Sequence, residues 1–150
     1  MAQLFSLGLE TRAMIPSLHF LLAGIRAHTF VRPDYYAGFV CDDALDQRDS
    51  SGPFDSDWSE VFNATKERWR DVSSEVRAQV EEIRREVFLV VSKATHQHEI
   101  ASYVSDDFDL ICRCKVLAIE HPIIEHLWLA YQSGTFPLPK AHAAQKSNEA

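Results

Sequence analysis

The sequence predicts an all-α protein, a single-domain bundle of about five to six helices, with the N-terminal third open between helix and strand. Neither glycine nor proline occurs between positions 54 and 121, and these two residues most often end helices and strands. Apolar residues in that stretch recur every three or four positions, as on one face of a helix. The 150 residues, 46% of them hydrophobic, suffice for one core. We therefore expect residues 1–140 to form one helical domain and residues 141–150 a disordered tail.

The first third of the chain gives the weakest signals. Residues 18–25 are mostly apolar and predict a buried helix, in a run too short to span a membrane. Residues 34–41 have the composition of a strand. As a helix capped by Asp34, they gather their apolar side chains on one side: Tyr35, Tyr36, Phe39 and Val40. We favour the helix because the rest of the chain is helical, and residues 28–45 stay open between the two. Residues 46–56 are expected to form a polar loop.

Two long helices are predicted next, over residues 57–70 and 72–95. Asp57 followed by Glu60 matches a capping box at the start of the first helix. Its inner face would consist of Trp58, Val61, Phe62, Thr65 and Trp69. Candidate N-caps of the second helix are Asp71, Ser73 and Ser74. Residues 87–91 are apolar on all sides, which predicts that this end of the helix is buried.

The C-terminal part predicts two further helices. Ser105 is the expected N-cap of one, where the carboxylates of Asp106, Asp107 and Asp109 would complement the helix dipole. A short helix over residues 97–104 would precede it. The sequence His121-Pro122 separates it from the last helix, because proline suits a first helical turn. The last helix would stop at Gly134 and has the apolar stripe Ile123, Ile124, Leu127, Trp128 and Tyr131.

The excess negative charge lies in one segment, residues 34–60. The chain has a formal net charge of −7, and this segment holds eight acidic residues and one base, Arg48, while 14 acidic and 14 basic residues elsewhere balance. Such a patch repels nucleic acid and anionic membranes. Carboxylates mixed with aromatic residues suit a basic protein partner, and a solvated loop is the alternative. The candidate partner-binding residues are Tyr35, Tyr36, Asp42, Asp43, Asp46, Asp49, Asp55, Asp57 and Trp58.

A rival hypothesis is a helical metal-binding protein or enzyme that uses the His and Glu side chains near 96–99 and 120–126. His121 and Glu125 share a helical face, but neither group offers a full set of zinc ligands. The sequence has no His-Glu-x-x-His, Glu-x-x-His, phosphate-binding glycine loop or Gly-x-Ser-x-Gly motif. We therefore expect no metal, no cofactor and no catalytic residues, and favour a binding protein over an enzyme.

Three cysteines, Cys41, Cys112 and Cys114, make an odd number without regular spacing. Such a set argues against a disulfide framework. Reduced thiols in a cytoplasmic protein are the simplest interpretation, with Cys114 as a small residue of the core.

The C-terminal third carries a pattern with a known counterpart. It runs from Ser105-Asp-Asp-Phe-Asp, through the His121-Pro122 break, to Trp128-x-x-Tyr-x-x-Gly-x-Phe-Pro137. This pattern resembles the end of small helical bacterial proteins associated with toxin immunity. The resemblance implies a non-enzymatic inhibitor that binds a cognate toxin. Together with the acidic charge, it implies a toxin of the nuclease type, with a basic surface that handles nucleic acid. A homodimer that hides the aromatic side chains is a further hypothesis.

Overall fold

The structure, a computed structural model, describes residues 14–140. Seven helices and no strand occur in this part of the chain, which confirms the all-α prediction. The helices are α2 (Leu18–Arg26), α3 (Pro33–Ala37), α4 (Cys41–Ser50), α5 (Gly52–Trp69), α6 (Ser74–Thr95), α7 (His98–Leu117) and α8 (Pro122–Gln132). The tail expected for residues 141–150 lies outside the described residues, and the extent of the domain stays a prediction.

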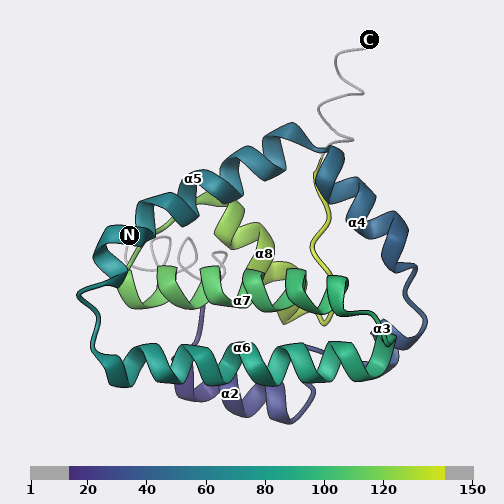
Figure 1. Cartoon of the computed structure of the whole chain (residues 1–150), viewed down its shortest axis with the longest axis horizontal. Coiled ribbons are helices and arrows are strands. Elements are labelled where there is room, and N and C mark those ends of the chain that lie inside the picture. Colours follow the sequence, from purple (N-terminus) through teal and green to yellow (C-terminus); the bar gives the residue numbers. More distant parts are fainter. Residues whose placement is uncertain (1–13, 141–150) are drawn as a thin grey trace, which may run out of the picture.

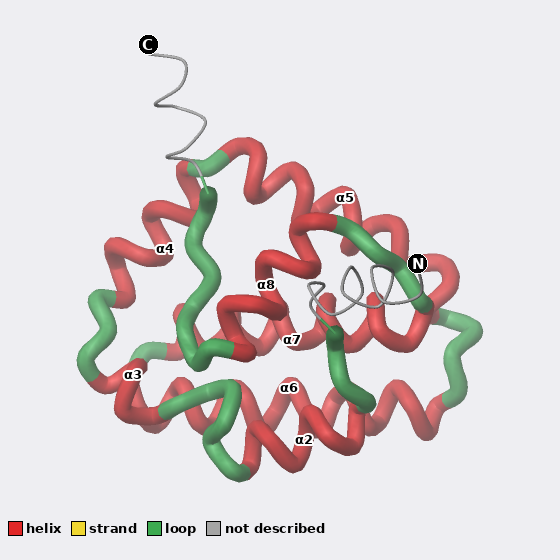
Figure 2. Tube along the Cα trace, turned by 180° about the vertical axis from the view of Figure 1, so that it is seen from behind, coloured by secondary structure: helices red, strands yellow, loops and turns green. Residues whose placement is uncertain are grey.

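Helices α6 and α7 form the centre of the molecule and lie side by side along most of their length (Figure 1). Helices α2 and α3 pack against α6, whereas α5 and α8 pack against α7. Helix α4 lies at the edge, and its closest helical neighbour is α5. From the end of α8, residues 133–140 run back beside α4 without regular secondary structure (Figure 2). The segment with the excess acid is therefore on the rim of the fold.

The apolar stripes predicted for α5 and α8 are confirmed. On α5, Val61 and Thr65 are buried, and the stripe's three aromatic residues are half-buried against the core. On α8, all five predicted residues are buried. His121 caps α8 just before Pro122, and its Nδ1 accepts a hydrogen bond from the backbone N of Ile123 at 3.1 Å. Both stripes thus face the central pair of helices.

Helix α6 begins as predicted and departs from the prediction near its end. The Oγ of Ser73 caps it by accepting a hydrogen bond from the backbone N of Val76 at 3.2 Å. This end of α6 is largely buried, as predicted, since Val87 and Val91 are fully buried and Phe88 and Val90 are half-buried, but Leu89 is 48% exposed. A helix on the surface of a bundle keeps one face in solvent even where its sequence is apolar.

The segment from α3 to α5 departs most from expectation. Helix α3 begins at Pro33 with Arg32 as its N-cap and ends at Ala37, so Asp34 is not a cap. The polar loop expected over residues 46–56 is wrong, because α4 continues to Ser50 and α5 begins at Gly52. Helix α4 forms although most of its residues are polar. It buries one face, which consists of Cys41, Ala44, Leu45 and Arg48.

The capping box expected at Asp57 and Glu60 is also wrong. Ser51 caps α5, and its Oγ accepts a hydrogen bond from the backbone N of Phe54 at 3.3 Å. Pro53 follows in the first turn, a position that suits proline. Asp57 and Glu60 therefore lie inside the helix rather than at its start.

Helix α7 is one helix where two were expected. It begins at His98 after the N-cap Gln97 and continues to Leu117. Ser105 lies in its interior, so its predicted role as a cap is wrong, and the short helix over residues 97–104 is the first part of α7. The predicted dipole role of Asp106, Asp107 and Asp109 fails with it, because these carboxylates lie mid-helix and are stabilised by arginines instead.

The three cysteines are free and buried, and the prediction that Cys114 belongs to the core is confirmed. Burial raises the pKa of the Cys114 thiol to about 12, although the charge of Arg113 opposes this shift. Over residues 14–140, no helix combines the length and the apolar character that crossing a membrane requires.

Candidate protein-binding surface

A buried ion pair ties α4 to the core. Nη1 of Arg48 lies 2.7 Å from Oδ2 of Asp107, and Nη2 lies 3.0 Å from Oδ1. The carboxylate of Asp107, on α7, is fully buried. It also accepts hydrogen bonds from Nε1 of Trp58 at 2.9 Å and from the hydroxyl of Tyr131 at 2.6 Å. One buried carboxylate therefore joins α4, α5, α7 and α8.

Three aromatic rings enclose the guanidinium of Arg48. Its Cζ lies 4.5 Å from the ring centre of Phe54, 5.0 Å from that of Phe136 and 5.4 Å from that of Tyr103. Such positions favour a cation over the ring faces. Burial acts to lower the pKa of Arg48, but the charge and hydrogen bonds of Asp107 outweigh burial and raise it. Arg48 therefore stays charged inside the protein.

The burial of Arg48 leaves the outside of its segment without a base. All eight acidic residues of segment 34–60 are exposed, whereas the side chain of Arg48 is only 7% exposed. Seven of these carboxylates lie on two consecutive helices and are here named the acidic surface: Asp42, Asp43, Asp46 and Asp49 of α4, and Asp55, Asp57 and Glu60 of α5. Uncompensated charge of one sign attracts partners of the other sign.

Within α4, the carboxylates share one side. Asp42, Asp46 and Asp49 are four and three residues apart, a spacing that places side chains on one helical face. The buried stripe of α4 occupies the opposite face. The hydroxyl of Tyr103 on α7 donates a hydrogen bond to Oδ1 of Asp49 at 2.5 Å. Asp49 is therefore fixed to the body of the protein, and Asp42, Asp43 and Asp46 have no such contact with α7 among the described residues.

The structure places the three candidate aromatic residues differently from the acids. Tyr36 is 1% exposed, so its side chain belongs to the core and not to the surface. Tyr35 and Trp58 are half-buried, and the Tyr35 hydroxyl accepts a hydrogen bond from the backbone N of Phe136 at 3.1 Å. The exposed apolar side chain beside the acids is Val40, 64% exposed just before α4, a residue that sequence reasoning did not select.

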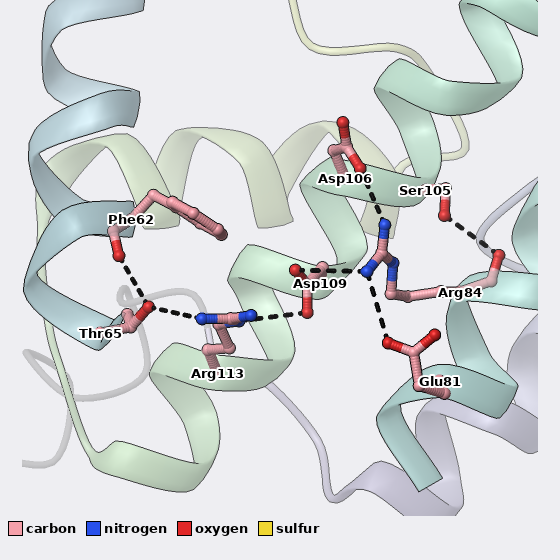
Figure 3. A network of polar contacts seen from close by, with 8 residues as sticks. All are labelled: Phe62, Thr65, Glu81, Arg84, Ser105, Asp106, Asp109 and Arg113. Atoms are coloured by element: carbon pink, nitrogen blue, oxygen red, sulfur yellow. Dashed lines mark hydrogen bonds and ion pairs between the residues drawn. The ribbon is translucent and has the colours of Figure 1, made fainter. Parts of the chain in front are cut away.

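A second polar network, separate from α4, surrounds Asp109 (Figure 3). Nε of Arg113 lies 3.3 Å from Oδ1 of Asp109, and Nη1 of Arg84 lies 3.7 Å from Oδ2. Arg84 also pairs with Asp106 at 3.0 Å, and Arg113 donates to Oγ1 of Thr65 at 3.1 Å. Burial raises the pKa of Asp106, although the charge of Arg84 opposes this. This network joins α5, α6 and α7.

The His and Glu side chains of the rival hypothesis take part in local contacts. Nδ1 of His98 lies 3.0 Å from Oγ of Ser92, and Nε2 of His126 lies 2.6 Å from the carbonyl O of Leu138. His121 is the cap of α8 described above, and His96 ends α6 in the left-handed conformation. Across residues 14–140, no three His, Cys, Asp or Glu side chains lie close enough to hold a metal ion together.

Comparison with known protein families gives one match. The family described as "Immunity protein PIM1" matches residues 20–138, which include α3 to α8 and most of α2. The match contains both partners of the buried ion pair, the whole acidic surface and the C-terminal pattern from Ser105 to Pro137. No curated protein sequence gives a significant match.

Proposed function

The chain belongs to the Immunity protein PIM1 family, and we propose that it inhibits a cognate toxin by binding it through the acidic surface. The observation that carries the choice of surface is the burial of Arg48, the only base of segment 34–60, beneath helices whose outer carboxylates are all exposed. Of the predicted aromatic contacts, Tyr35 and Trp58 are half-buried, and Trp58 lies on α5 between Asp57 and Glu60 in the sequence. Inhibition by binding requires no catalytic residue and no cofactor in this chain.

The charge of the surface defines the chemistry of the partner. A toxin that contacts seven carboxylates needs lysine or arginine side chains on its docking face, because buried like charges repel. A surface of that kind is what an enzyme that handles nucleic acid presents to phosphates. We therefore favour a nuclease-type toxin that acts in the cytoplasm. The free thiols are consistent with that reducing compartment.

The test uses the toxin encoded by the neighbouring gene. Purified toxin is mixed with the wild-type protein or with the triple variant Asp42→Asn, Asp43→Asn, Asp46→Asn, and both inhibition and the Kd are measured. We expect the triple variant to bind at least about tenfold more weakly, since it loses three attractive charges without losing volume.

A matched control changes three exposed carboxylates outside the surface. Glu67, Asp71 and Glu75 lie at the end of α5 and the start of α6, and the variant Glu67→Gln, Asp71→Asn, Glu75→Gln should inhibit like the wild type. Failure of the wild-type protein to bind the toxin would refute the proposed function. Equal loss in both triple variants would refute the choice of surface.

A further inference from the structure

We infer that Asp107 is a positioning residue for the acidic surface: it holds α4 in place through Arg48, so that partner affinity depends on a carboxylate that never touches the partner. The consequence for affinity rests on the proposed function, whereas the attachment of α4 can be tested without any partner. The geometry behind the inference is the bidentate contact of 2.7 and 3.0 Å between the two side chains.

Helix α4 has few other means of attachment. Its buried side chains besides Arg48 are those of Cys41, Ala44 and Leu45, of which only one is large. Its closest helical neighbour is α5, which follows it after the single residue Ser51. Arg48 is therefore the largest group that α4 inserts into the body of the protein, and its partner Asp107 lies 59 residues further along the chain.

Loss of the Asp107 carboxylate would leave Arg48 without its partner and would affect the position of α4. A guanidinium enclosed by three rings and deprived of its carboxylate would be a buried, uncompensated charge, which is strongly unfavourable. Arg48 regains hydration only if α4 moves away from α7. Such a movement carries Asp42, Asp43 and Asp46 with it and brings a base to the surface that is otherwise purely acidic. Both effects weaken the fit to a basic partner.

Asp109, which lies on α7 like Asp107, provides a matched control. Its side chain is also buried, 7% exposed, and it also pairs with arginines, at 3.3 Å to Arg113 and 3.7 Å to Arg84. Those arginines belong to α7 and α6 rather than to α4. Asp107→Asn and Asp109→Asn thus each remove one buried charge, two residues apart on α7, but only the first disturbs the link to α4.

The first measurement is hydrogen–deuterium exchange of the full chain, followed separately for the peptides of each helix. The second is the Kd for the toxin encoded by the neighbouring gene. In Asp107→Asn we expect the amides of α4 to exchange at least about a hundredfold faster while those of α6 and α7 keep their protection, and the affinity to fall at least about tenfold. In Asp109→Asn we expect α4 and the affinity to stay as in the wild type.

Arg48→Lys supplies a milder variant in case Asp107→Asn does not fold. Lysine keeps the charge but loses the bidentate contact and the stacking, so the exchange of α4 should still rise selectively. Uniform loss of protection over the whole chain in Arg48→Lys, or equal effects of Asp107→Asn and Asp109→Asn on α4, would overturn the inference. Selective release of α4 without loss of affinity would overturn its link to binding. A wild-type protein that does not bind the toxin would instead refute the proposed function and leave the exchange result standing.

Discussion

Helix α4 and the α6–α7 pair are held in the fold by different forces. The pair is joined through apolar side chains, among them Ile83 and Val87 of α6 and Ile100 and Phe108 of α7, all fully buried. Helix α4 buries only three apolar side chains, those of Cys41, Ala44 and Leu45, and the largest group that it inserts into the core is the guanidinium of Arg48, paired with a carboxylate of α7. Apolar burial is non-directional and shared by many residues, whereas a buried ion pair requires both members in the right geometry. We therefore expect damage to the α6–α7 pair to weaken the whole fold, and damage to the Arg48–Asp107 ion pair to release only α4 and its acidic surface.

The largest loss of stability is expected from a substitution in the apolar contacts of the α6–α7 pair and its neighbours. Phe108→Ala removes a fully buried ring that packs 4.6 Å from the ring centre of Tyr131 and should lower the free energy of unfolding by about 4 kcal/mol. Urea denaturation followed by circular dichroism measures the loss. Phe20→Ala, at a side chain that is 60% exposed, is the control and should stay within about 0.5 kcal/mol. A similar small loss for both would refute the described core.

The next largest loss of stability is expected at the Arg48–Asp107 ion pair, where a double-mutant cycle measures the coupling of the two side chains. Arg48→Met and Asp107→Asn should each destabilise the protein by about 3 kcal/mol, because each leaves one buried charge unpaired. The double variant removes both charges, and the amide introduced at position 107 keeps one oxygen as an acceptor for Trp58, while its nitrogen can donate to the hydroxyl of Tyr131. We expect it to lose at least about 1 kcal/mol less than the sum of the single variants. Additive losses in the same urea titrations would show that the two side chains are not coupled.

A smaller change in stability is expected at the C-terminal end of α7. Ala118 ends α7 with a φ of 57°, a conformation that is unfavourable for residues with a Cβ atom and natural for glycine. Ala118→Gly should therefore stabilise the protein by up to about 1 kcal/mol, measured as a rise in Tm. Ala78→Gly, at an exposed position inside α6, should lower stability by about 1 kcal/mol. A fall in Tm for both would contradict the left-handed conformation of Ala118.

The smallest effect concerns the second tie between α4 and α7. The hydrogen bond to Asp49, followed by burial and the charge of Asp49, raises the pKa of Tyr103 to about 12 from its ordinary value of 10.0. The raised pKa means that the folded state holds the proton more tightly than the unfolded state. Its contribution to stability is complete below pH 10 and is lost as the pH rises toward 12.

Alkaline titration of the wild type and Tyr103→Phe, followed by tyrosinate absorbance and by α-helical signal, isolates this contribution. Burial also raises the pKa values of Tyr36 and Tyr131, so the difference between the two proteins, and not the total absorbance, reports Tyr103. Tyr103→Phe should be less stable than the wild type below pH 10, and the gap should narrow between pH 10 and 12. A gap that is constant over that range would contradict the hydrogen bond to Asp49.

The periodicity of apolar residues predicted the buried faces of the helices well. The stripes of α5 and α8, the cap Ser73 and the break at His121-Pro122 follow from local spacing and local chemistry. The pattern from Ser105 to Pro137 also led to the toxin-immunity resemblance, which the family match confirms. These features need no knowledge of distant partners, so the sequence contains what is required to find them.

The buried ion pairs could not be predicted in the same way. Asp106, Asp107 and Asp109 look like first-turn acids, and only the arrangement in space shows that they meet Arg84, Arg48 and Arg113. The second half of α4, residues 46–50, looked like a loop because its one buried residue is charged. A signal was present: Arg48 is the single base of an acidic segment and continues the spacing of Cys41, Ala44 and Leu45.

Docking of a basic toxin on the acidic surface should make the association rate depend on salt concentration. Stopped-flow mixing of the protein with the neighbouring-gene toxin, from about 0.05 to 0.5 M salt, varies the screening of charge. We expect the wild-type rate to fall at least about tenfold over this range, and the rate of the Asp42→Asn, Asp43→Asn, Asp46→Asn variant to start lower and fall less. A wild-type rate that does not change with salt, or one that the variant reproduces, would show that the toxin does not dock on the acidic surface.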